Sequence, residues 1–238
     1  MIYILPLLSV LLGYGIALFL KPTKKTNLKL LMAFSGSFLL SITVMHLLPE
    51  VYESAHHGDH NHSNAVGIFI MVGILFQIIL EFFSKGAEHG HVHSHGHDDS
   101  KMPWALFISL CIHAFMEGFP VSHHSDLALG IAIHHLPIAV ILTSFFLNSH
   151  LNKTVVFFFM ATFALMTPLG TLTAEYFTFL NHYYTEITAI VIGILFHISS
   201  TIIFESSENH KFNLAKLSMI AIGIILAYFL GIEAPHSH

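Results

Sequence analysis

The sequence predicts an all-α integral membrane protein with eight transmembrane helices and both termini outside the cell. The whole chain, residues 1–238, is expected to form one polytopic membrane domain. Three observations predict this: the composition, the spacing of the apolar runs and the placement of the lysines. Of the 238 residues, 54% are hydrophobic and only 10% are charged. Soluble domains carry about 25% charged residues because water must wet their surface, so most of this surface must face lipid.

Apolar runs of roughly 17–25 residues are long enough to cross the bilayer core as helices. The first run has no basic segment before it and no obvious cleavage site after it, so we interpret it as a retained helix and not as a signal peptide. The segments between runs contain the Pro, Asn, Ser, Lys and His typical of loops. The predicted spans lie near residues 2–20, 28–48, 65–84, 104–122, 126–147, 154–179, 185–205 and 213–232.

Lysine placement predicts the orientation. Cytoplasmic loops of membrane proteins are enriched in basic residues. The chain has nine basic residues, all lysine, and they fall in every second connection between the predicted spans or in the first four residues of the span that follows it. They are Lys21, Lys24, Lys25, Lys29, Lys85, Lys101, Lys153, Lys211 and Lys216. This alternation supports eight spans with outside termini, and it makes residues 85–103 a His-rich cytoplasmic loop between the third and fourth spans.

Ionisable side chains in the fourth and fifth spans are the main functional signal. An ionisable group at membrane depth costs about 2.5–3.5 kcal/mol on insertion scales, so it marks a functional hypothesis. His113 and Glu117 are four residues apart and share one helix face. His134 and His135 come shortly before Pro137, which should kink its helix. A buried ion pair is the alternative, but no lysine or arginine is expected to be buried where it could neutralise Glu117, so we expect a bound cation with His113, Glu117 and His134 as ligands.

Weaker candidates lie along the other spans. His46 and Glu50 are again four residues apart and are expected at an entrance or exit of a transport path, or simply in the membrane interface. His197 is expected either on this path or as a hydrogen-bonded packing residue. Glu175 and Glu205 are further path candidates. The carboxylate of Glu81, at the end of the third span, is expected to be solvated.

Two internal tracts are rich in histidine, and imidazole is a ligand for zinc and similar metals. The tract in the cytoplasmic loop is expected to capture metal, and it is expected to form no packed structure because its residues bury little surface. Its histidines are His89, His91, His93, His95 and His97, followed by Asp98 and Asp99. A second tract, residues 56–62, and the histidines near the C-terminus would then lie on the opposite side of the membrane.

Several classes of protein are disfavoured by residue types that the chain lacks. Cys111 is the single cysteine, so neither an internal disulfide nor a thiolate-rich metal site can form. The absence of arginine argues against a nucleic-acid partner. A membrane metalloenzyme of the di-iron oxidase type needs HxxxH pairs or an HExxH helix, and no predicted span contains one. This enzyme, and a metal sensor that binds without transport, remain the alternatives to a transporter. We expect no prosthetic group.

These motifs, in this order, resemble the ZIP (Zrt/Irt-like) metal transporters over nearly the whole chain. The family pattern H-N/S-x-x-E-G in the fourth helix is matched by HAFMEG, residues 113–118, and H-x-x-P-E in the fifth is matched in part by HHLP, residues 134–137. The HLLPE of the second helix and the TPLG of the sixth are also similar. The resemblance implies uptake of divalent cations, zinc first and Fe²⁺ or Mn²⁺ as alternatives, by a multi-pass protein of the plasma membrane that forms homodimers.

Two positions depart from the family pattern. Ile138 stands where many members have a carboxylate, and Ala114 stands where they have a polar residue. In members with paired metal sites these positions help to build or bridge the second site. The resemblance therefore implies a variant with one site, made by His113, Glu117 and His134, while His135 is a candidate for a residual second site.

Overall fold

A computed structural model describes residues 3–20, 25–56, 61–84, 104–123, 125–148, 151–205 and 214–232. These residues are almost entirely helical, and none of them forms a strand. The helices are α1 (Ile4–Leu20), α2 (Lys25–Ile42), α3 (Leu48–His56), α4 (Asn61–Ser84), α5 (Trp104–Glu117), α6 (Ser125–Asn148), α7 (Lys153–Tyr176), α8 (Thr178–Asn181), α9 (Tyr184–Glu205) and α10 (Leu214–Ile232). A π-helical turn, η1 (Thr43–Leu47), joins α2 to α3, and a short 3₁₀ turn, η3 (Pro120–Ser122), precedes α6.

Within the described residues, six helical segments are long and apolar enough to cross a bilayer, which fits the predicted all-helical, multi-pass membrane protein. They correspond to the second to seventh predicted spans, residues 28–55, 65–83, 104–122, 127–147, 153–176 and 184–204. The first and last predicted spans are shorter apolar helices within α1 and α10. The count of eight spans and the orientation therefore stay predictions.

Helix boundaries differ from the expected spans at three places. The second helical segment runs beyond residue 48, through η1 into α3, and Pro49 lies in the first turn of α3. α5 ends at Glu117, just before Gly118 and Pro120. α7 begins where the Asn152 side chain accepts a hydrogen bond from the Thr154 backbone N–H, 3.0 Å away, and it ends at Tyr176.

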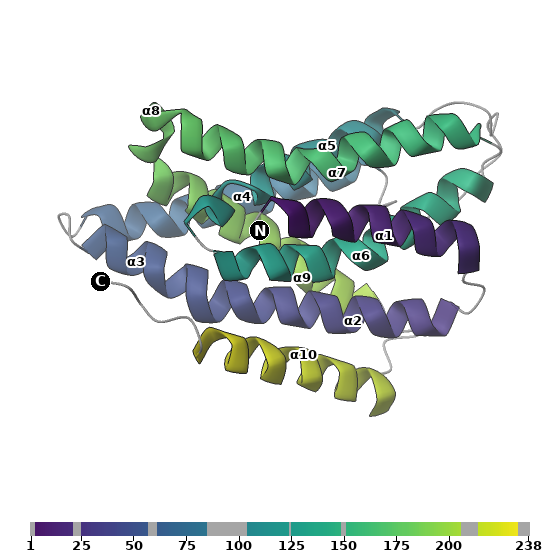
Figure 1. Cartoon of the computed structure of the whole chain (residues 1–238). Helices are drawn as coiled ribbons and strands as arrows, with labels where there is room; N and C mark the ends of the chain where they lie inside the picture. The colour runs from purple at the N-terminus through teal and green to yellow at the C-terminus, as the bar shows by residue number, and fades with distance from the viewer. Residues whose placement is uncertain are drawn as a thin grey trace.

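The long helices lie side by side in a bundle (Figure 1). The most extensive pairings are α1 with α6, α4 with α9, α2 with α10 and α5 with α7. One apolar core is shared by α1, α5, α6 and α7, and it contains Phe146, Met160 and Phe163. A second core lies among α2, α4, α6 and α9, and it contains Phe38 and Leu195. α6 contributes to both cores, so its inward-facing residues lie at the centre of the molecule.

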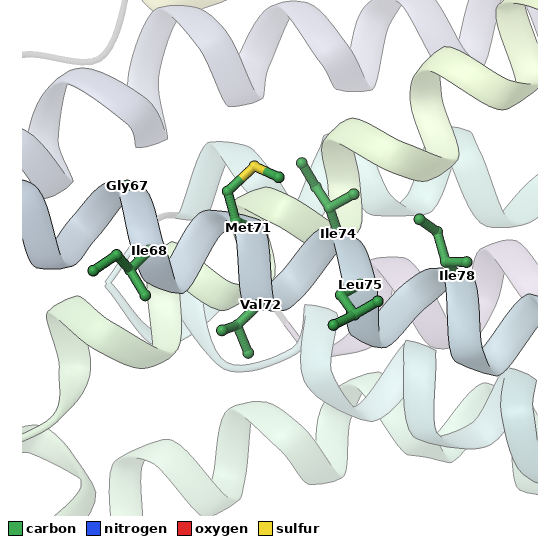
Figure 2. Close-up of a pocket in the computed structure, with 7 residues that line it drawn as sticks. All are labelled: Gly67, Ile68, Met71, Val72, Ile74, Leu75 and Ile78. Carbon is green, nitrogen blue, oxygen red and sulfur yellow. The ribbon is translucent and has the colours of Figure 1, made fainter.

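Large apolar side chains cover much of the outer surface, as lipid contact requires. Phe19, Phe82 and Leu214 are among those that are at least three-quarters exposed. A shallow apolar depression on this surface is lined only by residues of α4, from Gly67 to Ile78 (Figure 2). Its lining has no ionisable side chain, so it offers no charged ligand to a cation.

At several helix crossings the backbones approach so closely that only glycine fits, and two of these crossings are the tightest. In α4 and α9, a Cβ atom on Gly73 or Gly193 would overlap with a backbone carbonyl of the facing helix. In α5 and α7, a Cβ atom on Gly118 would overlap with the carbonyl oxygen of Thr167, and one on Gly170 would overlap with that of Phe115. The second crossing lies directly beside Glu117.

Candidate metal centre

The last turn of α5 places His113 and Glu117 on one helix face, as their spacing predicts. His113 Nε2 lies 3.0 Å from Glu117 Oε1. Both side chains are buried, with exposed fractions of 1% and 0%. A carboxylate removed from water needs a positive or hydrogen-bonding partner. The bundle therefore holds Glu117 in a place where a cation would be strongly favoured.

α6 supplies two more histidines to the same place. His134 and His135 are 0% and 1% exposed. The rings of His113 and His134 meet edge to face with centroids 6.4 Å apart. His135 Nε2 lies 3.0 Å from the other carboxylate oxygen of Glu117, Oε2. The helix continues through Pro137, which cannot donate to the carbonyl of Ile133.

Three of these residues could hold one metal ion. His113, Glu117 and His134 each offer a ligand atom, and these atoms all lie within 4.8 Å of one another. A tetrahedral zinc ion with bonds of about 2.0–2.2 Å separates its ligand atoms by roughly 3.3 Å. Small rotations of the side chains would therefore bring all three onto one ion, with a water molecule as the fourth ligand. No other such group of three occurs among the residues that the structure describes.

The end of α5 is fixed against α7 by contacts that could not be predicted from the sequence. The Thr171 hydroxyl donates to the carbonyl oxygen of Gly118 at 2.8 Å. Gly118 N–H in turn donates to the Phe115 carbonyl at 3.2 Å, which tightens the last turn. Together with the Gly118–Gly170 crossing, these contacts fix the position of Glu117. Sequence reasoning missed Thr171 and Gly170 as supports of the site, although the similarity of the TPLG segment to the family pattern was a signal that could have found them.

The two positions that depart from the family pattern are both apolar and buried. Ala114 is 0% exposed and Ile138 is 6% exposed. Both belong to the apolar core shared by α1, α5, α6 and α7. Neither side chain offers a ligand atom, so neither position can help to hold a second metal ion.

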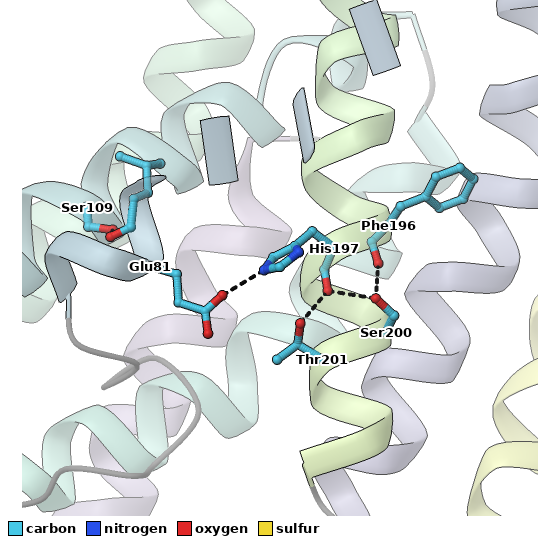
Figure 3. Close-up of polar contacts among 7 residues, drawn as sticks. Glu81, Ser109, Phe196, His197, Ser200 and Thr201 are labelled. Carbon is cyan, nitrogen blue, oxygen red and sulfur yellow. Dashed lines mark hydrogen bonds and ion pairs between the residues drawn. The ribbon is translucent and has the colours of Figure 1, made fainter. Parts of the chain in front are cut away.

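His197 does not join the buried cluster. Its Nε2 lies 2.6 Å from Glu81 Oε2, and this pair links α9 to α4 (Figure 3). The two side chains are 19% and 22% exposed. Glu81, which was expected to be solvated, is partly exposed and also contacts an imidazole, because α9 packs along α4. The expectation of a hydrogen-bonded His197 agrees with this contact. Ser109 of α5 donates to the carbonyl of Leu80 at 3.1 Å, next to this pair.

The remaining candidates lie apart from the cluster or outside the described residues. His46 lies in the turn η1 and Glu50 in the first turn of α3, and both are half-buried. Glu175 is exposed near the end of α7 and accepts a hydrogen bond from the Tyr3 hydroxyl. The side chain of Glu205, the loop histidines His89, His91, His93, His95 and His97, and the tract of residues 56–62 lie outside the described side chains.

Comparisons with known proteins identify a family. Residues 1–103 match the family model of the ZIP zinc transporters. This stretch contains α1 to α4 and ends before α5, so it does not include the His/Glu cluster. Zinc transporter ZIP1 of Plasmodium falciparum (isolate 3D7) is 24% identical over 293 aligned residues, which cover 90% of this chain and 82% of that protein.

Two mammalian proteins are similar over a shorter stretch. Zinc transporter SLC39A7 of Mus musculus is 32% identical over 86 residues, and the protein of the same name in Rattus norvegicus is 30% identical over 86 residues. Each alignment covers 31% of this chain but spans only 18% of the relative. The resemblance that the motifs predict is confirmed: residues 1–103 match the ZIP zinc transporter family model, and the chain is similar to named zinc transporters.

Proposed function

We propose that this protein transports divalent metal cations, zinc first, across the membrane toward the cytoplasm. The ion binds at His113, Glu117 and His134, between α5 and α6. One observation carries the proposal: three buried side chains of metal-ligand type converge within 4.8 Å inside an apolar bundle. The family match supports the same function, because the relatives are named zinc transporters.

The ligand set suits zinc by its chemistry. Zn²⁺ prefers four ligands, and this site offers two imidazole nitrogens, one carboxylate oxygen and a water molecule. Because the water can exchange, the zinc ion can also be released from the site. Fe²⁺ and Mn²⁺ accept similar donors, so they are the alternative substrates. An arriving hydrated ion exchanges its waters for these side chains, and the Glu117 carboxylate offsets its charge. Release follows when the site opens to the cytoplasm. On this proposal the protein is a transporter and not an enzyme.

Purified protein in liposomes tests this function. With a zinc-sensitive dye inside, external Zn²⁺ is expected to raise the internal signal in vesicles that contain the protein and not in protein-free vesicles. The same vesicles, given Fe²⁺ or Mn²⁺ and suitable dyes, rank the substrates. If zinc binds to the protein but the dye signal inside the vesicles never rises, the protein is a metal sensor and not a transporter.

The remaining path candidates belong to this proposal as flanking contacts for the moving ion. His46 and Glu50 are proposed for the outer end, with Glu175 at the edge of the bundle. His197, bonded to Glu81, is proposed for the inner end. Location in the plasma membrane, with both termini outside, and assembly as a homodimer complete the proposal; surface labelling of tagged termini and cross-linking in the membrane test these two points.

The cytoplasmic histidines are proposed to capture or sense metal after it has crossed. Deleting residues 89–97 is expected to change the affinity or the regulation of uptake while leaving transport intact, because the deletion removes none of the three ligands in the bundle. Initial uptake rates over a range of zinc concentrations measure this. Abolished transport in a correctly inserted deletion variant would contradict the role.

A further inference from the structure

The Glu117 carboxylate is held from two sides by two different histidines. Its Oε1 oxygen lies 3.0 Å from His113 Nε2, and its Oε2 oxygen lies 3.0 Å from His135 Nε2. The three atoms that could share an ion come from His113, Glu117 and His134, and His135 is not among them. His134 and His135 are neighbours in sequence, but their ring centroids are 6.0 Å apart. His113 and His135 thus contact different oxygens of the carboxylate, and only His113 belongs with His134 to the group that could share an ion.

The bond between His135 and Glu117 has a defined direction. A carboxylate that binds a cation is ionised, and an ionised carboxylate can only accept hydrogen bonds. The proton of this bond must therefore come from His135 Nε2. A nitrogen that carries this proton has no lone pair left for a metal ion. The ring of His135 also packs on Phe163 with centroids 5.3 Å apart, which fixes its orientation.

We propose that His135 is a positioning residue that sets the metal selectivity of the site, and not a metal ligand. Its Nε2–H holds Glu117 Oε2 and so orients the carboxylate to present Oε1, the oxygen beside His113, to the ion. This inference rests on the proposed transport function and deepens it, because it says which ions the site selects. It also replaces the expectation that His135 serves a residual second metal site.

The selectivity follows from the number of oxygen ligands. With Oε2 occupied by His135, the ion receives two imidazole nitrogens, one carboxylate oxygen and water. Zn²⁺ is stable in such a four-coordinate shell. Mn²⁺ prefers octahedral shells that are rich in oxygen, and carboxylates can bind such ions through both oxygens. Freeing Oε2 would add an oxygen ligand and shift the preference from Zn²⁺ toward Mn²⁺.

Two substitutions separate positioning from ligation. His135→Leu keeps the bulk of the ring but removes the donor. His135→Gln places an amide N–H close to the position of Nε2, so it can still donate to Oε2. Because partners that orient a metal ligand typically contribute 10- to 100-fold to affinity or activity, His135→Leu is expected to raise the KM for zinc about tenfold, with a smaller change in kcat. The ratio of zinc to manganese uptake should fall by a similar factor.

Uptake of Zn²⁺ and Mn²⁺ into vesicles by the full-length protein decides the proposal. The expected result is a lower zinc-to-manganese ratio for His135→Leu and a ratio near that of the wild type for His135→Gln. Should His135→Leu fail to fold, His135→Asn, whose amide is too short to reach Oε2, gives the same comparison. The positioning role is overturned if a folded variant without the donor, His135→Leu or His135→Asn, keeps the wild-type ratio of zinc to manganese uptake. It is also overturned if His135→Gln is as impaired as His135→Leu. Wild-type protein that moves neither ion would overturn the transport function itself.

Discussion

Replacing Glu117 with glutamine is expected to lower the initial rate of zinc uptake by about 100-fold or more. Glu117 is the only carboxylate that is fully buried among the described residues, and it contacts both His113 and His135. The amide has the same shape, but it has lost the negative charge that offsets the ion. Partners that merely orient a ligand contribute 10- to 100-fold, so the loss of a ligand should reach or exceed the upper end of that range. Vesicle uptake, normalised to the amount of inserted protein, measures the effect.

Glu81→Gln is the matched control for this substitution. Glu81 also bonds a histidine on a neighbouring helix, His197, at 2.6 Å, but it lies outside the group of three ligands. We expect Glu81→Gln to retain uptake within a few fold. The comparison therefore separates the loss of a carboxylate–imidazole contact between helices from the loss of a ligand. Glu117→Gln protein that transports zinc at the wild-type rate would remove Glu117 from the ion path.

Replacing Gly170 with alanine is expected to destabilise the protein and to disturb the site without touching a ligand. The added Cβ atom would overlap with the Phe115 carbonyl oxygen, which belongs to backbone and cannot rotate away. α5 and α7 must then separate at the residue that follows Glu117. Overpacking of this kind typically costs about 1–3 kcal/mol, which exceeds the roughly 1 kcal/mol that alanine gains over glycine in a helix. Thermal unfolding in detergent should show a lower Tm.

Gly15→Ala provides the opposite case in the same bundle. Gly15 lies in α1, and no heavy atom outside its own helix lies within 4 Å of the position that a Cβ atom would take. Alanine there should leave Tm unchanged or raise it slightly, because only helix propensity changes. If Gly170→Ala and Gly15→Ala shift Tm equally, the close crossing of α5 and α7 does not contribute to stability as described.

Much of the fold and of the candidate site was predictable because both depend on local sequence patterns. Apolar runs of the length of a bilayer fix where helices form, and the six long helices lie where the runs predict. Spacing of four residues places His113 and Glu117 on one face whatever the rest of the fold does. The pairing with His134 was a less local prediction, and it rested on the rule that polar groups in a membrane span face inward.

The parts that could not be predicted depend on how distant helices pack. Nothing near Glu81 in the sequence indicates that His197, 116 residues later, will bond it. The glycines at 118 and 170 are unremarkable until two backbones are brought together. His135 contacts Glu117 Oε2, whereas His134 belongs to the group of three possible ligands. Adjacent residues in a helix differ in direction by about 100°. Only the packing of α6 against α5 therefore decides which of the two histidines makes which contact.

The vesicle uptake assay, applied to the ligands of the cluster, tests the central claim most directly. Zinc uptake by the wild-type protein is compared with uptake by His113→Ala and His134→Ala, and with His182→Ala as an exposed histidine outside the cluster. We expect His113→Ala and His134→Ala to lose nearly all zinc uptake, and we expect His182→Ala to match the wild type. Uptake at the wild-type rate by folded His113→Ala or His134→Ala protein would show that zinc crosses the membrane by another route.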